Sequence, residues 1–358
     1  MKPDIVLNKD DLFVSPDHAG LVYSGRIDFS NSDAPCFIYA GSQVHFRFKG
    51  TDLKIIVRNY RSYYDNYIGY IIDNKLQGKF KLDPADTVTI LPVAQKLEDL
   101  EHDVIIYKRQ DAAHYFDFLG IVINKTSVIL DAPAKPLRRM ECFGDSVSAG
   151  EVCEAIEYVG KPDPEHSGEF SNSWYSYTSI TARKLGAQLH NNGQGGLALL
   201  DQTGYFHGPD YVGLESTYDK LRYNTQLGPY SLWDFNLYTP HVVLVAIGQN
   251  DSHPENYMGK DKQKSDHWKF RYKAMILQLR KLYPKALIIL KTTILNHSKE
   301  WDDAIDEVTK AMADPKIVHF LYTNNGCGTP GHIRIPEAQQ MAEELTEFIN
   351  SFGDSIWE

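Results

Sequence analysis

Cysteine is scarce in this chain, and no two cysteines have the spacing of a metal or redox motif. The 358 residues contain four of them, at Cys36, Cys142, Cys153 and Cys327, and none belongs to a Cys-x-x-Cys pair. A zinc ribbon or a redox-active dithiol is therefore not expected. We expect four free thiols, and a bridge between Cys153 and Cys327 is the alternative.

Long apolar runs and an excess of basic residues are also missing. No hydrophobic stretch approaches the length of a membrane span, and Met1–Val6 lacks the apolar core of a signal peptide. We therefore expect a cytoplasmic protein, or a secreted one whose signal has been removed, with no membrane partner. A formal net charge of -10 argues against nucleic acid as a partner. Whether identical copies assemble is left open by the sequence.

The first part of the chain alternates apolar and polar residues and shows no convincing helix. Within residues 21–130, Val44–Lys49 follows this period of two, and Asp73–Lys75 has the composition of a hairpin turn. This patterning predicts an antiparallel β-sandwich over residues 1–133. The two prolines of Asp131–Pro136 indicate a stiff linker, and we place the domain boundary there.

In residues 134–358, short apolar strands alternate with segments of helical spacing. The predicted strands are Met140–Phe143, Ala187–His190, Val242–Ile247, Ala286–Leu290 and Ile317–Leu321. The predicted helices are Trp174–Leu185, Trp268–Leu282 and Pro336–Phe352. This alternation predicts an α/β domain of three α/β/α layers around a five-stranded parallel sheet. In such sheets, functional residues gather at the carboxyl ends of the strands.

A serine follows the first predicted strand of this sheet, within Gly144–Ser146. Gly144 permits a tight turn, and the start of the helix that follows offers backbone N–H groups to an oxyanion. On its own, the motif also fits a helix-capping serine. The next strand ends in a glycine-rich turn, where the N–H of Gly196, or that of Gly195, can approach a ligand. An ordinary flexible turn is the alternative there.

Two further polar residues follow later strands. Asn250 ends the third strand, where its amide can donate to an oxyanion, and His332 precedes the last helix, where it can take a proton from Ser146. An asparagine that satisfies loop carbonyls, or a histidine without a role, is the alternative. Because all these motifs fall at strand ends, we predict one hydrolytic site with Ser146 and His332 as catalytic residues. The Ser146 N–H, the Gly196 N–H and Asn250 would form its oxyanion hole. This chemistry requires no metal ion and no cofactor.

These motifs, with Gly248 and Asp251, resemble the conserved blocks of the SGNH (GDSL) hydrolases. Other segments resemble carbohydrate esterase family 2: Gly25–Phe29, His45–Thr51, Phe118–Gly120, Ile180–Ala187 and Trp233–Phe235. The resemblance implies a jelly-roll-like sandwich followed by a flavodoxin-like hydrolase domain. It also implies an acetyl esterase whose substrates are acetylated plant oligo- or polysaccharides such as xylan and mannan.

One position departs from the pattern of SGNH hydrolases. These enzymes commonly carry an aspartate three residues before the histidine, and this chain has Thr329 there, which supplies no charge. Members without that aspartate orient the histidine with a backbone carbonyl. The resemblance therefore implies a Ser–His pair, and we expect the carbonyl near Thr329 to hold His332. An acid from elsewhere in the chain is the alternative.

Aromatic faces suit sugar rings, and several rings lie in predicted connections: Tyr205, Tyr211, Trp233, His253, Tyr257 and Trp301. Of these, we expect Trp301, His253 and Tyr257 to contact substrate, with packing as the alternative. Two other functions stay open from the sequence. One is a lipolytic or lysophospholipid esterase on the same fold, and the other is a carbohydrate-binding protein with weak or lost catalysis.

Overall fold

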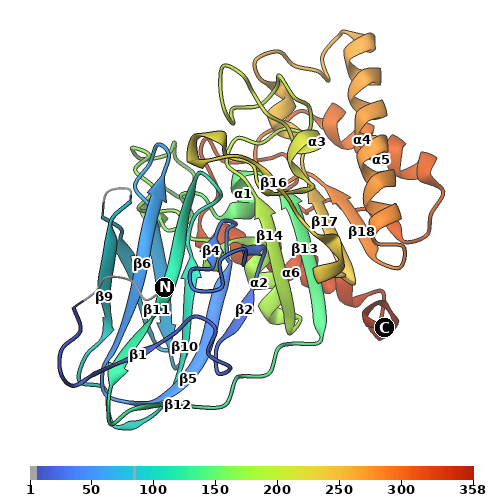
Figure 1. Ribbon diagram of the computed structural model, residues 1–358. Coiled ribbons are helices and arrows are strands. Elements are labelled where there is room, and N and C mark those ends of the chain that lie inside the picture. The colour runs from blue at the N-terminus through green and yellow to red at the C-terminus, as the bar shows by residue number, and fades with distance from the viewer. Residues whose placement is uncertain (1–5, 84–85) are drawn as a thin grey trace.

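The computed structural model describes residues 6–83 and 86–358, and its first part is a β-sandwich (Figure 1). One antiparallel sheet contains β1 (Asp11–Val14), β3 (Ile27–Asp28), β4 (Cys36–Phe37), β6 (Leu53–Arg61), β9 (Val88–Ala94) and β11 (His114–Asn124). The other contains β2 (Val22–Ser24), β5 (Gln43–Gly50), β7 (Tyr67–Ile72), β8 (Leu76–Lys81), β10 (Leu100–Lys108) and β12 (Val128–Ile129). The predicted antiparallel β-sandwich is confirmed.

The alternation of residues in the strands explains the core of the sandwich. In β5, Val44, Phe46 and Phe48 are fully buried, and they pack with residues of both sheets. Burying such side chains stabilises the fold by roughly 1.5–3 kcal/mol each. At the predicted hairpin, Asp73 and Asn74 have positive φ angles, which suit the tight turn between β7 and β8.

The second part is a three-layer α/β/α domain, as predicted. Its parallel sheet has the order β14 (Ala187–Gly193), β13 (Arg138–Gly144), β17 (Val242–Ala246), β18 (Leu287–Lys291) and β19 (Ile317–His319). One face is covered by α1 (Ser146–Ala149), α2 (Tyr177–Lys184) and α6 (Ile335–Asn350), and the other by α4 (Lys262–Leu282) and α5 (Lys299–Met312). Taken in chain order, the strands run 2-1-3-4-5, the flavodoxin-like arrangement, whose ligand sites lie beyond the carboxyl ends of strands 1 and 3.

Smaller elements fill the connections of this domain. They are α3 (Leu214–Thr217), β15 (Lys220–Arg222) and β16 (Ser231–Leu232), with 3₁₀ segments at Ile156–Tyr158, Ser173–Tyr175, Thr225–Leu227, Phe235–Leu237, Gln249–Ser252 and Asp354–Trp357. The predicted linker lies between β12 and β13. Among the described residues, no helix has both the length and the apolar character needed to cross a bilayer.

Two helices differ from the prediction. The segment 174–185 is not one helix, because Ser176 ends a 3₁₀ turn and caps α2 by accepting a hydrogen bond from the Ser179 N–H at 3.3 Å. Helix α5 is missing from the prediction, although Trp301, Ala304, Ile305 and Val308 have helical spacing and lie buried on its inner face. The spacing of apolar residues over 299–312 is the sequence signal that indicates this helix.

A buried ion pair joins the two domains. Arg26, between β2 and β3, is fully buried, and its Nη2 donates to Glu141 Oε1 on β13 at 2.9 Å. Its Nη1 donates to the Tyr218 carbonyl at 2.8 Å. Glu141 also accepts from the Tyr283 hydroxyl at 2.6 Å and from Asn192 Nδ2 at 3.0 Å. Every charge in this contact is therefore paired inside the protein.

Replacing Arg26 should destabilise the whole molecule. We expect Arg26→Met to lower the free energy of unfolding by about 3–5 kcal/mol, because it leaves the Glu141 carboxylate buried without its counter-charge. Equilibrium urea unfolding followed by circular dichroism measures this. Lys262→Met is the control, since Lys262 pairs at the surface with Asp266, with side chains that are 85% and 46% exposed, and such pairs contribute about 0–1 kcal/mol. A loss of less than 1 kcal/mol in Arg26→Met would contradict the expectation.

Candidate active site

Ser146 is the first residue of α1, immediately after β13. The helix is capped by Asp145, whose Oδ1 accepts from the Val147 N–H at 3.0 Å and whose Oδ2 accepts from Gln249 Nε2 at 2.7 Å. Gly150 ends it in the left-handed conformation, with φ +79°. At the first position of a helix, the Ser146 N–H has no carbonyl of the same helix to bond. The turn therefore presents both the hydroxyl and the N–H of Ser146 at the carboxyl edge of the sheet.

The glycine-rich turn after β14 carries one N–H, that of Gly196, for which the described part of the chain offers no acceptor. Within the turn, the Gly195 N–H donates to Asp111 Oδ2 at 2.7 Å and the Leu197 N–H donates to the Gln194 carbonyl at 3.1 Å. The Gly196 N–H donates to no group within the described residues. With φ +72°, Gly196 has a backbone conformation that favours glycine. Of the two glycines considered from the sequence, Gly196 is thus the one with an N–H free to bind a ligand.

Asn250 lies just beyond β17, in the 3₁₀ segment Gln249–Ser252. Its Nδ2 donates one hydrogen to the Leu197 carbonyl at 2.9 Å, which fixes the amide and leaves the second hydrogen for a ligand. The next residue, Asp251, is fully buried and accepts from the N–H groups of Leu199 at 2.8 Å and Leu200 at 3.0 Å. The third strand and the glycine-rich turn are therefore held to each other.

His332 is held by an aspartate that the sequence did not identify. Its Nδ1 lies 2.6 Å from Asp163 Oδ2, and its backbone N–H donates to Asp163 Oδ1 at 2.9 Å. Arg334 Nη2 donates to the same Oδ1 at 2.7 Å. The expectation that a carbonyl near Thr329 holds the ring is wrong, because Nδ1 can carry one hydrogen and the Asp163 carboxylate accepts it. The alternative, an acid from elsewhere in the chain, describes the structure.

The charges around His332 favour its protonated form. Burial alone would lower the pKa of His332, but the hydrogen bond to Asp163 and the charges of Glu151 and Asp163 raise it above the ordinary value. Burial would likewise raise the pKa of Asp163, yet its contacts with His332 and Arg334 hold it well below the usual range. An aspartate that stays ionised fixes the tautomer with Nε2 free and stabilises the imidazolium.

One pocket of about 530 Å³ collects these groups. Ser146, Gly196, Asn250 and His332 all line it, although they come from four separate connections of the parallel sheet. Ser146 follows β13 and Asn250 follows β17, which are the two strands at which the flavodoxin-like order places a ligand. The arrangement suits acyl transfer: a hydroxyl nucleophile, a histidine base with its acid, and N–H donors for an oxyanion.

Trp301 was expected to contact substrate, and the structure excludes this. Its side chain is 1% exposed and packs edge-on against Trp268 in the core, with ring centroids 5.3 Å apart. The physical reason is that Trp301 lies on the inner face of α5 instead of in a loop. Tyr257, also expected to contact substrate, is partly buried against the same core and is absent from the lining of the pocket.

Two tyrosines do line the pocket. Tyr205, in the connection after β14, is 58% exposed, and its ring stacks on His253 with centroids 4.1 Å apart. His253, a third expected contact, therefore supports Tyr205 and does not itself line the pocket. Tyr64 reaches the pocket from the β6–β7 loop of the sandwich. The sequence offered Tyr205 as one aromatic among several, and it gave no reason to select Tyr64.

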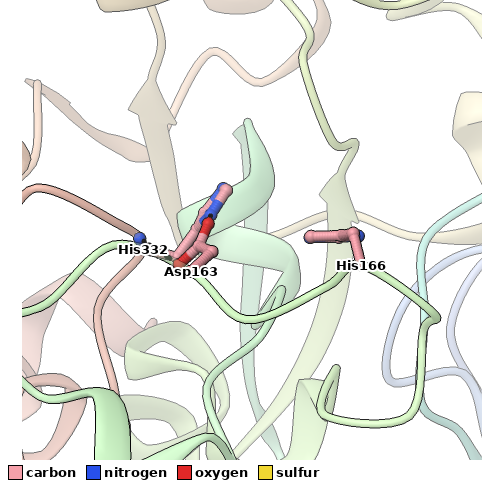
Figure 2. A group of neighbouring side chains, drawn as sticks. All are labelled: Asp163, His166 and His332. Carbon is pink, nitrogen blue, oxygen red and sulfur yellow. Dashed lines mark hydrogen bonds and ion pairs between the residues drawn. The ribbon is translucent and has the colours of Figure 1, made fainter.

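Asp163, His166 and His332 form a group whose nitrogen and oxygen atoms lie within 4.8 Å of one another (Figure 2). Figure 2 shows the Asp163 carboxylate against the His332 ring, with His166 standing apart from both. His166 Nε2 instead pairs with Glu151 Oε1 at 3.0 Å. His332 Nδ1 and His166 Nε2 therefore each already have a carboxylate partner, Asp163 and Glu151. The group fits an Asp–His pair better than a metal centre.

The four cysteines are unpaired. Cys153 is buried, and its Sγ donates to the Asn172 carbonyl at 3.1 Å, whereas Cys327 is exposed. The bridge considered between these two thiols is therefore not formed. Burial raises the pKa of Cys153 to about 12, so this thiol stays protonated and unreactive.

Known proteins are similar to this chain in sequence and in fold. Residues 23–133 match the family Carbohydrate esterase 2 N-terminal. The chain is 28% identical over 354 residues to the cellulase/esterase CelE of Acetivibrio thermocellus, covering 94% of this chain and 40% of that protein. It is 27% identical over 341 residues to an acetylxylan esterase / glucomannan deacetylase of Cellvibrio japonicus, covering 92% of this chain and 88% of that protein. The chain thus spans less than half the length of the first of these relatives.

A solved structure is also similar to this chain in its fold. A family two carbohydrate esterase from Clostridium thermocellum, in complex with cellohexaose, superposes with a TM-score of 0.79 at 26% identity. The match covers 95% of this chain and 100% of that chain. Both the sandwich and the parallel-sheet domain therefore occur together in that protein as they do here.

Proposed function

We propose that this chain, whose residues 23–133 match the N-terminal domain of carbohydrate esterase family 2 and whose fold is similar to that of a solved esterase of this family, removes O-acetyl groups from plant polysaccharides. The observation that carries this proposal is the convergence of four groups on one pocket: the Ser146 hydroxyl, the unused Gly196 N–H, the Asn250 amide and the His332–Asp163 pair. Together they supply every group that a two-step acyl transfer needs.

The reaction begins when His332 Nε2 takes the proton of Ser146 Oγ, which attacks the acetyl carbonyl carbon. The Ser146 N–H, the Gly196 N–H and the Asn250 amide hold the oxyanion that forms. The oxyanion collapses, the bond to the sugar oxygen breaks, and His332 gives its proton to the departing sugar hydroxyl. A water molecule, deprotonated by the same histidine, then attacks the acetyl-enzyme and releases acetate. Asp163 stays ionised throughout and steadies the imidazolium.

We propose acetylated xylan or mannan as the substrate. The Cellvibrio relative is named for acetylxylan and glucomannan, and the Clostridium structure contains cellohexaose. In this chain, the exposed Tyr205 ring, stacked on His253, gives the pocket a flat aromatic face of the kind that sugar rings stack on. Glu151, Asn250 and Asn296 add polar groups to the lining. A long acyl chain would meet these polar groups, which disfavours the lipolytic alternative.

Time-resolved NMR of acetylated xylan and mannan oligosaccharides tests the proposal. We expect free acetate to appear while the ring-bound acetyl signals disappear, and the order of their disappearance reports which hydroxyl is deacetylated. A series of aryl esters from acetate to octanoate is the companion measurement, and the acetate should react fastest. Faster hydrolysis of the long esters would favour a lipolytic enzyme. Glycan binding without acetate release would favour a binding protein.

A further inference from the structure

We propose that Asp111, a residue of the β-sandwich, is a positioning residue for the oxyanion hole of the neighbouring domain. It lies in the short connection between β10 and β11 and is 8% exposed. The proposal rests on the acyl-transfer function given above. It assigns the sandwich a part in catalysis in addition to any contact with a glycan.

The carboxylate of Asp111 is bonded to the glycine-rich turn at two points. Its Oδ2 accepts from the Gly195 N–H at 2.7 Å and from Gln194 Nε2 at 2.8 Å. Its Oδ1 accepts from the Ala113 N–H at 3.0 Å, which fixes the carboxylate to its own loop. Gln194 is held in turn by the Tyr223 hydroxyl, which donates to Gln194 Oε1 at 2.7 Å. Hydrogen bonds to a charged group are the stronger ones, about 1.5–3 kcal/mol each.

The approach is close enough to require glycine at position 195. A Cβ atom built there would lie 2.8 Å from Asp111 Oδ2 and 2.6 Å from Glu151 Oε2, which is closer than side-chain carbons come to such atoms. A side chain at position 195 would therefore displace one or both of these carboxylates, and with Asp111 the hydrogen bond that it accepts from the Gly195 N–H.

The N–H that Asp111 binds is one residue before the N–H of the oxyanion hole. Because peptide units are planar, the direction of the Gly195 N–H restricts that of the Gly196 N–H through two dihedral angles. On the far side of Gly196, Asp251 accepts from the Leu199 and Leu200 N–H groups at 2.8 and 3.0 Å. Gly196 is thus held between two buried carboxylates, of which only Asp111 comes from the other domain.

Asp111→Asn tests the proposal, because the substituted amide has one acceptor oxygen in place of two. We expect kcat on an aryl acetate to fall by about 10- to 100-fold, a part of the roughly 10²–10³-fold cost of losing an oxyanion donor outright. KM should stay within about twofold, so that the loss falls on kcat and not on substrate binding.

Asp28→Asn is the matched control. Asp28 is also 8% exposed and also joins the sandwich to the other domain, through Arg222 Nε at 2.7 Å, but among the described residues it accepts no hydrogen bond from the glycine-rich turn. We expect this variant to lose stability in urea unfolding while keeping kcat within about twofold. Equal losses of kcat in Asp28→Asn and Asp111→Asn would indicate a general effect of weakening the domain contact and would overturn the positioning role.

Two further variants, Gln194→Met and Asn250→Ala, separate a failure of the positioning role from a failure of the proposed function. Gln194→Met leaves Asp111 in place and removes one of its two donors on the turn, so a several-fold loss of kcat is expected even where Asp111→Asn does not fold. If folded Asp111→Asn or Gln194→Met keeps wild-type kcat while Asn250→Ala is impaired, Asp111 has no positioning role. If Asn250→Ala also keeps wild-type kcat, the oxyanion hole itself is wrongly assigned and the proposed function fails first.

Discussion

Ser146→Ala is expected to lower kcat on an aryl acetate by about 10⁶-fold, close to the complete loss seen when a triad serine is removed. The variant keeps the oxyanion donors but has no atom that can form the acetyl-enzyme. Spectrophotometric assay of the aryl acetate, with circular dichroism to verify the fold, measures the effect. Acetate release from an acetylated glycan should disappear in parallel.

Ser148→Ala is the matched control for this experiment. Ser148 lies two residues later in the same short helix, is fully buried, and places its Oγ 2.8 Å from the Tyr177 hydroxyl. It faces the interior of the domain and not the pocket, so we expect kcat within about threefold of the wild type. If Ser146→Ala kept more than about a hundredth of the wild-type kcat, the nucleophile would have to be another residue.

Asp163→Asn carries the second large effect, a fall in kcat of about 10⁴-fold. An asparagine in this place can present its NH₂ group to His332 Nδ1, which then carries no hydrogen, so that Nε2 holds the proton and cannot accept one from Ser146. Steady-state assays on an aryl acetate measure the loss. A dyad held by a backbone carbonyl would lose far less, so this variant distinguishes the Asp163 contact from the Thr329 arrangement.

The same variant should shift the pH dependence. The rate requires neutral His332, so kcat/KM falls as pH drops through the pKa of this histidine. The Asp163 charge raises that pKa, and removing it should move the acid limb of the profile to lower pH.

Glu151→Gln is the comparison, because Glu151 Oε2 lies 3.9 Å from His332 Nε2 and also raises the pKa of His332. It should shift the limb in the same direction with less than about tenfold loss of kcat, since it does not orient Nδ1. An unmoved or upward-shifted limb in Asp163→Asn would contradict this account.

The part of the site that could be predicted from the sequence is the part that follows strands. Ser146, Gly196 and Asn250 come directly after β13, β14 and β17, and parallel strands bring their carboxyl ends to one edge. Local apolar patterns were enough to find these strands. His332 could be added because it opens the last helix of the same domain.

Asp163 could not be found in this way. It lies 169 residues before His332 in an irregular segment between α1 and α2, where no periodic pattern constrains the path of the chain. Asp111 is hidden for a related reason, since its partners belong to another domain and no local pattern reports a contact between domains. Trp301 differs from these two, because the helical spacing around it is present in the sequence and indicates a buried helical position.

The buried Arg26–Glu141 ion pair has a consequence for recombining the two parts of this chain with other proteins. Arg26 projects from the sandwich into the interior of the α/β domain. There its guanidinium donates hydrogen bonds to the Glu141 carboxylate and to two backbone carbonyls, those of Tyr218 and Lys220. Recombination at the Asp131–Pro136 linker would remove Arg26 from its binding cavity. It would leave the Glu141 carboxylate buried in the second domain without its counter-charge. The two halves of this chain should therefore be transplanted as a single unit.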